Sequence, residues 1–321
     1  MLKFIFKRIL IAMPLLLGIS FMTFALMQMT PGNFYDTMKL NPQVSPETIE
    51  YYKNKFFPDQ TMAQQYFHWV KNLLQGEFGY SLFYNVPVKH LIAERLGNTF
   101  ILSFASFLCT WLIALPLGIW AALHRNKFLD RLIQFFSYLA LSIPTFFLAM
   151  LLLYLVSQWR ILPLGGMHRA NFEELSFVAQ FFDFLQHLII PCLALSLGSI
   201  GALQKIMRGN MLEVLRQQYV LAARAKGLPE HRVIYVHALR NAVNPLITLL
   251  GYEFSGLLSG AALIEIISSW PGLGTLILTA VRSKDVYLVM ASMMMGGILF
   301  LIGNLLADIF LALSDPRIRY D

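Results

Sequence analysis

Six long runs of apolar residues, separated by shorter polar segments, dominate the pattern of the chain. A hydrocarbon core about 30 Å thick takes roughly 20 helical residues to cross, so each run predicts a membrane-spanning helix. The predicted spans are Ile9–Met29, Thr99–Leu123, Leu132–Gln158, His187–Met207, Val243–Ile267 and Tyr287–Leu313. Pro116 and Pro144 lie inside the second and third runs and predict interruptions there.

The first run follows the basic residues Lys3, Lys7 and Arg8, a combination that also begins secretory signal peptides. The run is too long for the apolar part of a signal peptide, and no small-x-small cleavage site follows it. We therefore expect this segment to stay in the protein as a membrane anchor.

The polar segment after the first run predicts a small folded cap. Thr30-Pro31-Gly32-Asn33 is a turn signal. Ser45-Pro46-Glu47 has the residue order of a helix start and predicts a helix from Pro46 to Lys55. A second helix is predicted from Met62 to Leu74.

Lysine and arginine are divided unequally between the two sides of the predicted bundle. Fifteen of the 25 lie at the N-terminus, in the loops after the second and fourth spans, and at the C-terminus, all on one side. Most of the others belong to the long segment after the first span, where the positive-inside rule has little force. The rule places both termini in the cytoplasm and the cap outside it.

The loop between the fourth and fifth spans, Arg208 to Pro245, is basic and has helical periodicity. Apolar residues recur at three- and four-residue spacing from Met211 to Ala223, which predicts one amphipathic helix. Gly227 predicts its left-handed end, and Pro229 predicts the start of a second short helix. The apolar face of that second helix is predicted to be Val233, Ile234, Val236 and Ala238.

Two interpretations of this hairpin fit its composition. It is either an interfacial helix pair on anionic lipid or a docking surface for a cytoplasmic partner. Ala222, Ala223 and Ala225 have little bulk and would let another protein approach the helix backbone closely.

Composition narrows the class of protein. Hydrophobic residues make up 57% of the 321 positions and charged residues only 13%, so a water-soluble fold is nearly excluded. The 14% of aromatic residues excludes disorder, and two cysteines exclude a disulfide scaffold. The sequence therefore predicts an all-α polytopic membrane protein with six spans.

The hairpin residues Tyr219-Val220-Leu221-Ala222-Ala223-Arg224-Ala225-Lys226-Gly227-Leu228 resemble the EAA loop of ATP-binding-cassette importer permeases, in particular the dipeptide/oligopeptide/nickel branch. Val236-His237-Ala238-Leu239-Arg240-Asn241-Ala242 is similar to the continuation of the loop in that branch. The acid that gives the loop its name is absent here, as is common in the peptide branch.

The resemblance covers the whole chain. Gly76-Glu77-Phe78-Gly79-Tyr80-Ser81 resembles an outer-loop element of the branch, Ser269-Trp270-Pro271-Gly272-Leu273-Gly274 resembles its SWPGLG turn, and Asp315-Pro316-Arg317-Ile318-Arg319-Tyr320 resembles its tail. These motifs occur in family order and at family spacing. The implied division is an anchor and cap over residues 1–95, a transmembrane domain over 96–313 and a tail over 314–321.

The resemblance implies a bacterial inner-membrane permease that forms half of a pathway for di- or oligopeptides. In that family the loop is a coupling helix that sits in a groove of the ATPase. The implied docking residues are Tyr219, Ala222, Ala223, Arg224, Ala225, Lys226, Gly227, Leu228 and Pro229. The implied partners are a second homologous permease, two ATPase subunits that carry ATP and Mg²⁺, and an extracytoplasmic solute-binding protein. The outer segment Pro31–Arg95 and the loop Arg160–Gln186 would face that binding protein.

No catalytic or metal motif is visible in the sequence. It contains no phosphate-binding loop, no H-E-x-x-H and no Cys/His cluster at metal spacing, so we expect no enzyme activity and no cofactor on this chain. The alternatives are a nickel-chelate importer of the same branch and, with less support, a self-sufficient secondary transporter.

Acids inside predicted spans are costly and therefore candidates for function. They are Glu253, Glu265 and Asp308. We expect Glu265 to accept hydrogen bonds at the turn that contains Trp270 and Pro271, and Asp308 to pair with a base near the inner interface. Glu253 could line a polar pathway or meet the partner subunit, and both alternatives stay open. These five residues are the candidates for the pathway or its gate.

Overall fold

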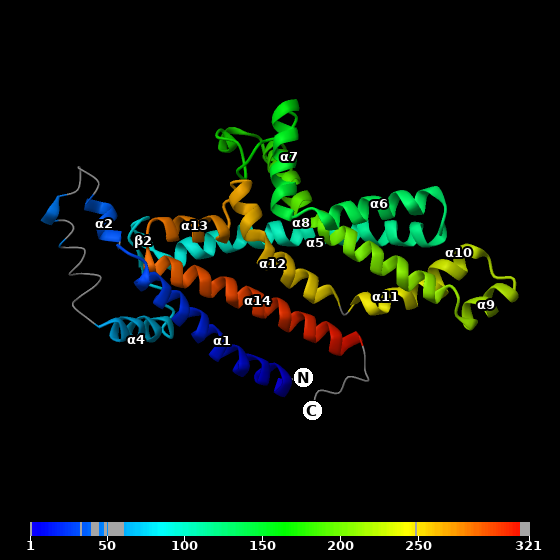
Figure 1. Cartoon of the computed structure of the whole chain (residues 1–321), viewed down its shortest axis with the longest axis horizontal. Coiled ribbons are helices and arrows are strands. Elements are labelled where there is room, and N and C mark those ends of the chain that lie inside the picture. The colour runs from blue at the N-terminus through cyan, green and yellow to red at the C-terminus, as the bar shows by residue number, and fades with distance from the viewer. Residues whose placement is uncertain are drawn as a thin grey trace. The chain divides into compact units, whose positions relative to one another are not determined.

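The computed structural model describes residues 2–32, 34–39, 45–47, 50, 61–247 and 249–314. The structure is helical apart from one two-stranded ribbon among these residues (Figure 1). The elements before the long second apolar run are α1 (Leu2–Met29), α2 (Phe34–Lys39), α4 (Met62–Leu73), β1 (Tyr80–Ser81) and β2 (Val86–Pro87). The elements of the middle are α5 (Val88–Leu123), α6 (Phe128–Ser142), α7 (Thr145–Trp159), η1 (Phe172–Glu174) and α8 (Phe177–Val214). The remaining elements are α9 (Gln218–Ala225), α10 (Glu230–Arg232), η2 (Val233–Ala238), α11 (Leu239–Ile247), α12 (Leu249–Ile267), α13 (Leu273–Arg282) and α14 (Val286–Ser314).

Four of the described helices are long and apolar enough to cross a membrane. They are α1 over Phe6–Met29, α5, α8, and α14 over Val286–Leu306. The pair α6 and α7 would make a fifth if it is one broken span. The predicted span Val243–Ile267 falls on α11 and α12, on either side of residue 248, which lies outside the described residues.

The third predicted span is not straight. Helices α6 and α7 meet at an angle of 107° around Pro144. Ile143 is extended, with φ −96° and ψ 125°, because the ring of a proline pushes the preceding residue out of the helical region. The predicted interruption at Pro144 is therefore confirmed. The one at Pro116 is wrong, because α5 continues through that residue.

The chain forms two compact units, and each is described by itself. The first holds Thr99–Trp270 and the described residues from Phe300 to Ser314. In it, α6, α7, α11 and α12 all pack on α8. The approach of α6 is close enough that a Cβ on Gly201 of α8 would lie 2.7 Å from the carbonyl oxygen of Ser137.

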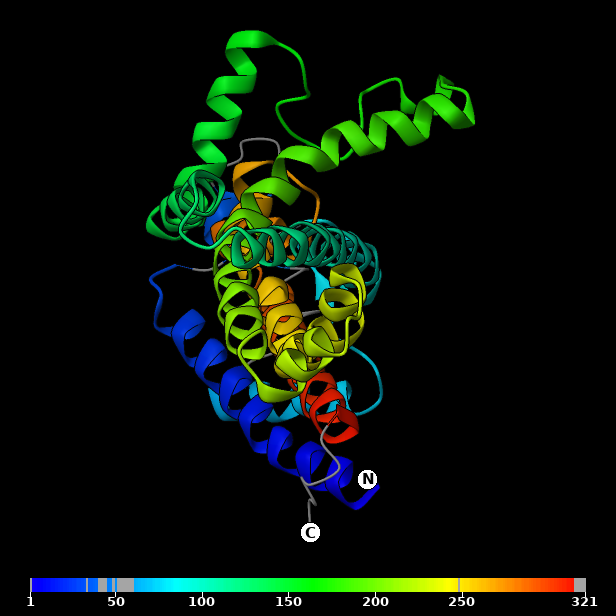
Figure 2. The same ribbon diagram turned by 90° about the vertical axis from the view of Figure 1, so that its right-hand side faces the viewer.

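Within this unit, α7 and the first turns of α8 diverge and are joined by residues 160–176 (Figure 2). The predicted loop Arg160–Gln186 is wrong in its second half, since α8 already begins at Phe177. The buried Asp183 accepts hydrogen bonds from the Arg169 side chain at 2.6 Å and from the Arg169 backbone N–H at 3.0 Å. This pairing fastens the loop to the first turns of α8.

The second unit holds Leu2–Asn98 and Pro271–Leu299. Its helix α4 confirms the prediction of a helix from Met62 to Leu74, and Thr61 and Gln64 form a capping box at its start. Trp69 of α4 packs with Phe24 of α1 and Met290 of α14. The predicted helix Pro46–Lys55 lies mostly outside the described residues.

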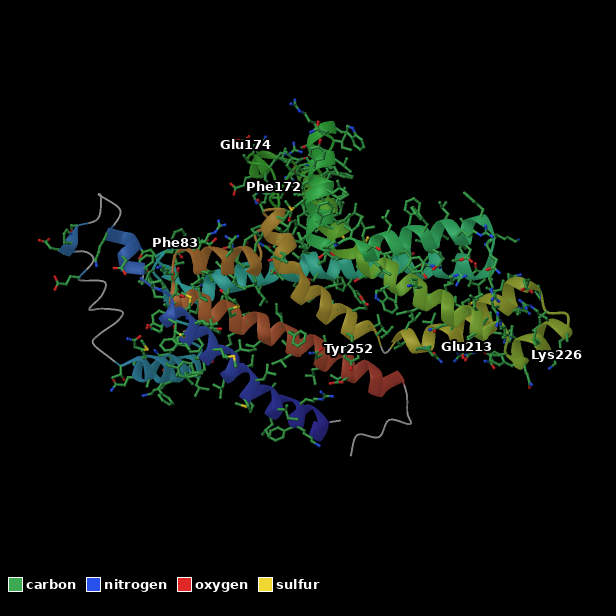
Figure 3. All side chains as sticks on the ribbon, in the orientation of Figure 1. Phe83, Phe172, Glu174, Glu213, Lys226 and Tyr252 are labelled. Carbon is green, nitrogen blue, oxygen red and sulfur yellow. The ribbon has the colours of Figure 1, made fainter. Side chains whose placement is uncertain are left out.

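A buried carboxylate holds the β1–β2 ribbon in this second unit. Asp285 accepts a hydrogen bond from the Ser81 hydroxyl at 2.6 Å, from the Phe83 N–H at 3.1 Å and from the Leu288 N–H at 3.3 Å. Burial raises the pKa of Asp285, and these hydrogen bonds offset part of the rise. The ring of Phe83, at the tip of the ribbon, is exposed (Figure 3).

Changing Asp285 to alanine is expected to release this ribbon. The substitution leaves the three donors without their acceptor, and each buried unsatisfied donor costs about 1–3 kcal/mol. We expect chymotrypsin to cleave at Phe83 and Tyr84 faster in purified Asp285→Ala protein than in the wild type. The matched control is Ser283→Ala, whose hydroxyl bonds only to carbonyls of its own helix. Equal cleavage rates in Asp285→Ala and wild type would contradict this role.

Candidate functional site

The candidate site is the basic hairpin, residues 208–247. The single helix predicted from Met211 to Ala223 is wrong, because α8 ends at Val214 and α9 begins at Gln218. The connecting residues form tight turns, with the Arg216 N–H bonded to the Glu213 carbonyl and the Gln217 N–H bonded to the Val214 carbonyl. No proline or glycine marks this break in the sequence.

Burial explains the break. Met211 and Val220 are nine residues apart, and at about 100° per residue a straight helix would point them to opposite sides. Both are fully buried in the same hydrophobic cluster. Turning the chain between α8 and α9 lets both side chains reach it.

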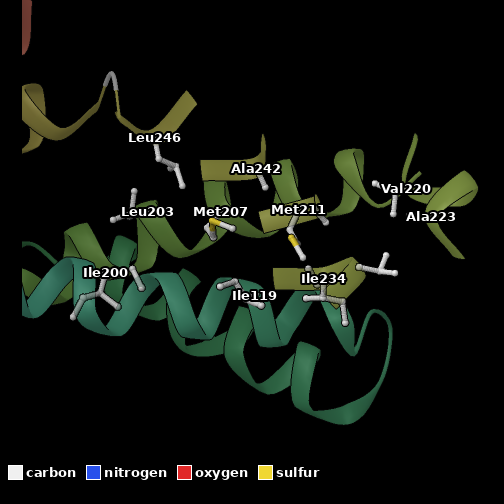
Figure 4. Packing of buried hydrophobic residues seen from close by; sticks show 14 residues of the cluster. Ile119, Ile200, Leu203, Met207, Met211, Val220, Ala223, Ile234, Ala242 and Leu246 are labelled. Atoms are coloured by element: carbon white, nitrogen blue, oxygen red, sulfur yellow. The ribbon is translucent and has the colours of Figure 1, made fainter. Parts of the chain in front are cut away.

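One face of the hairpin is buried in a hydrophobic cluster (Figure 4). Val220 and Ala223 of α9 pack with residues of η2 and α11 and with α5 and α8. The other buried members of the cluster are Ala114, Ile119, Ala122, Ile200, Leu203, Met207, Met211, Val233, Ile234, Ala238, Ala242 and Leu246. The hairpin is thus packed against the long helices α5 and α8.

The opposite face of α9 is exposed. It carries Tyr219, Leu221, Ala222, Arg224 and Ala225. Of the three alanines predicted to leave room for a partner, Ala222 and Ala225 face outward. Ala223 is only 7% exposed and packs inward.

The second helix differs from the prediction at one position. Val233, Ile234 and Ala238 are buried as predicted, but Val236 is 56% exposed. Residues Val233–Ala238 form a π-helix, in which hydrogen bonds join residues five apart. Val233 and Ala238 have that separation and share the buried face, whereas Val236 lies on the outer side.

The turn between the two helices forms as predicted. Gly227 has φ +77°, and its N–H bonds to the carbonyl of Arg224. The Leu228 N–H bonds to the carbonyl of Ala223, which completes a Schellman motif. Pro229 then precedes α10 as its N-cap residue. Lys226 and Gly227 are exposed on this turn, and Figure 3 labels Lys226 there.

Arg224 spans this turn. Its guanidinium donates to the two carboxylate oxygens of Glu230 at 3.2 and 2.5 Å. The pair is substantially exposed, so it adds little stability. It does fix the direction of the Arg224 side chain along the outer face.

A second ion pair, which the sequence did not suggest, anchors the base of the hairpin. Arg208 of α8 donates to both carboxylate oxygens of Asp130 in α6, each at 2.7 Å. Asp130 also accepts a hydrogen bond from the Asn126 N–H at 2.9 Å. The side chain of Asp130 is 4% exposed and that of Arg208 is 23% exposed.

The pathway candidates do not come together as a group. The carboxylate of Glu265 is buried and accepts a hydrogen bond from the Thr99 hydroxyl at 2.6 Å. Its backbone carbonyl accepts the Trp270 N–H at 2.8 Å, and the Trp270 ring is buried against Phe184. Pro271 follows in the turn, and its carbonyl accepts a hydrogen bond from the Asn98 side chain at 2.8 Å.

The other two acids lie elsewhere. Glu253 is partly buried in α12, within hydrogen-bonding reach of Ser199 in α8. Asp308 is buried in α14. Its predicted pairing with a base stays a prediction. Among the described residues, no group of three or more His, Cys, Asp or Glu side chains could hold a metal ion.

Two family models match the chain. Residues 114–320 match the inner membrane component of binding-protein-dependent transport systems, and residues 1–103 match the N-terminal part of the same component. The solved inward-facing MetNI methionine ABC transporter has a similar fold, with a TM-score of 0.57 over 71% of this chain and 97% of that chain at 15% identity.

Full-length relatives point to the same family. The chain is 36% identical to the oligopeptide transport system permease protein AppB of Bacillus subtilis, over all of both chains. It is 36% identical to a putative peptide permease of Brucella suis, over 99% of each chain. It is 31% identical to the dipeptide transport system permease protein DppB of Escherichia coli, over all of this chain and 99% of that one. The chain therefore belongs to the family of inner membrane components of binding-protein-dependent transport systems.

Proposed function

We propose that this chain is the permease subunit of an ATP-driven importer and forms half of a translocation pathway for di- or oligopeptides. Family membership over the whole length supports the importer, and relatives named for oligopeptide and dipeptide transport support the substrate class. The observation that carries the mechanism is the hairpin, with one face packed on α5 and α8 and the other exposed.

The proposed topology has six spans with both termini in the cytoplasm. The bent pair α6 and α7 is then one broken span, and α11 with α12 supplies another. The positive-inside distribution of Lys and Arg supports this orientation. The anchor and cap are residues 1–95, the transmembrane domain is 96–313 and the tail is 314–321. The cap and the segment before α8 would meet an extracytoplasmic solute-binding protein.

The hairpin is proposed to dock the ATPase. Tyr219, Ala222, Ala225 and Lys226 are exposed, and they present two small alanine side chains and one positive charge to the partner's groove. Val220 and Ala223 tie that face to α5 and α8, so a displacement of α9 is passed to the long helices. ATP and Mg²⁺ bound by the partner favour its closed dimer, and the docked hairpin then favours one membrane conformation over the other.

The proposed assembly contains a second, homologous permease and two ATPase subunits. Burial of Glu265, Trp270 and Asp308 inside this chain favours structural roles for them over direct contact with substrate. Glu253 is the acid best placed to line the pathway, because α12 leaves it partly exposed.

Co-purification from membranes in mild detergent tests this function. We expect the tagged chain to bring down an ATPase with a phosphate-binding loop and a second six-span protein. Uptake by the purified complex in vesicles should require ATP and should be competed by di- or oligopeptides. Competition by a nickel chelate and not by peptides would favour the nickel branch. Uptake by the chain alone without ATP would overturn the proposal.

The two faces of α9 allow a direct test of docking. Changing the exposed Ala222 to leucine is expected to lower ATPase retention in the purified complex about tenfold, since added bulk holds the partner away from the helix backbone. The matched change Ala223→Leu adds the same bulk inside the packed cluster and should lower the thermal stability of the permease instead. Wild-type ATPase retention in Ala222→Leu would place the docking surface elsewhere.

A further inference from the structure

A cavity of about 490 Å³ opens beside the start of α9. Its lining residues come from the α5–α6 turn, from the end of α8 and from the break before α9, and they are Arg125, Leu212, Glu213, Arg216 and Gln217. Figure 3 labels Glu213 at this end of the hairpin. No hydrogen bond or ion pair described above for the hairpin uses these side chains.

The walls of the cavity are fixed by backbone hydrogen bonds. On one side, the Lys127 N–H bonds to the His124 carbonyl at 2.9 Å, and Asn126 takes the left-handed conformation with φ 63°. On the other side, the Arg216 and Gln217 N–H groups bond to carbonyls of α8. Arg125 and Arg216 are therefore carried by two separate, hydrogen-bonded turns, and both line the same cavity.

The charge balance of the cavity favours an anion. Neither Arg125 nor Arg216 is in an ion pair with any residue that the structure describes. Asp130, whose charge also acts on Arg125, has both of its carboxylate oxygens hydrogen-bonded to Arg208. Glu213 cancels one of the two arginine charges, which leaves one net positive charge.

We propose that this cavity receives a single carboxylate side chain of the docked ATPase, held between Arg125 and Arg216. The inference rests on the proposed function and names a contact next to the docking helix. A guanidinium binds a carboxylate through two parallel hydrogen bonds, and one carboxylate matches the net charge of the cavity. A water occupies about 30 Å³ of liquid, so the cavity has room for the carboxylate and its remaining water. The contact lies at the start of α9 and would set the orientation of the ATPase relative to the hairpin.

Charge reversal at the cavity tests the contact in the complete transporter. Binding of the purified ATPase to the two-permease complex would be measured in nanodiscs of neutral lipid. Arg216→Glu and Arg125→Glu are each expected to weaken binding about tenfold at low salt, with a smaller difference at high salt. The matched control is Lys127→Glu, which makes the same charge change at an exposed residue of the same turn that does not line the cavity. It should bind as the wild type does.

A second set of variants locates the partner group. Glu213→Gln removes the competing acid and is expected to strengthen binding severalfold. An acid-to-lysine change on the ATPase surface is expected to restore binding to Arg216→Glu and to weaken binding to the wild type. Failure of every such acid change to restore binding would overturn the contact.

Three other outcomes are decisive. Wild-type binding by both arginine variants, alongside loss of binding by Ala222→Leu, would overturn the cavity proposal and leave the docking hairpin intact. An effect of Arg216→Glu that appears only when anionic lipid is added would assign the cavity to a lipid headgroup and overturn the protein contact. Absence of ATPase binding by the wild-type permeases would overturn the proposed function, and the cavity proposal with it.

Discussion

Replacing Gly227 with valine is expected to abolish transport while the chain remains in the membrane. Gly227 has φ +77°, a conformation that a β-branched residue adopts only under strain of about 1–3 kcal/mol. A Cβ at this position would meet nothing within 4 Å, so the substitution acts on the backbone and not through a clash. The Schellman turn should open and α9 should lose its fixed direction. Uptake in vesicles and the amount of protein in the membrane fraction measure the two halves of this result.

Gly209 provides a matched control for the backbone effect. It lies inside α8, and a Cβ there would also meet nothing within 4 Å, but its backbone is helical. Gly209→Val should therefore transport nearly as the wild type does. Gly227→Asn should retain activity, because asparagine tolerates the left-handed region. Wild-type uptake by Gly227→Val would refute the role of this turn in coupling.

Local rules account for the parts of the fold that the sequence predicted well. The turn at Gly227 and the start of α10 directly after Pro229 follow from the conformational preferences of these two residues. The helix α4 was predicted as well, and the capping box at its start, which was not predicted, lies within four consecutive residues. Such features need no knowledge of distant segments, so a single sequence is enough to find them.

Features that depend on distant packing could not be predicted in this way. The break between α8 and α9 has no local signal and follows from burial of Met211 and Val220 in one cluster. Thr99 and Glu265 are 166 positions apart, and Ser81 and Asp285 are 204 apart. The sequence identified Glu265 as an acid in a span but gave no means of finding its hydroxyl partner.

The same distinction applies to the candidate site. The motif located α9 and its turn, but it did not separate the outward Ala222 from the inward Ala223. That separation depends on which side of α9 meets α5 and α8. It decides which positions can contact a partner, so the structure changes the choice of residues to test.

Replacing Asp130 with alanine is expected to destabilise the permease by about 3 kcal/mol, near the lower end of the range for breaking a buried ion pair. The lower end applies because Arg208, left without its carboxylate, still reaches solvent. The Asn126 N–H loses its acceptor as well. Thermal unfolding of the purified protein in detergent, followed by tryptophan fluorescence, measures the loss.

The double variant separates the ion pair from the individual side chains. If the two groups act as a pair, Asp130→Ala combined with Arg208→Ala should destabilise the protein by much less than the sum of the single changes. The pair joins α6 to α8 at the base of the hairpin. The single Asp130→Ala variant should therefore transport less substrate for each ATP hydrolysed. The double variant should recover part of the lost transport per ATP. Strictly additive losses of stability would show that Asp130 and Arg208 act independently. The ion pair between α6 and α8 would then have no role in holding the hairpin.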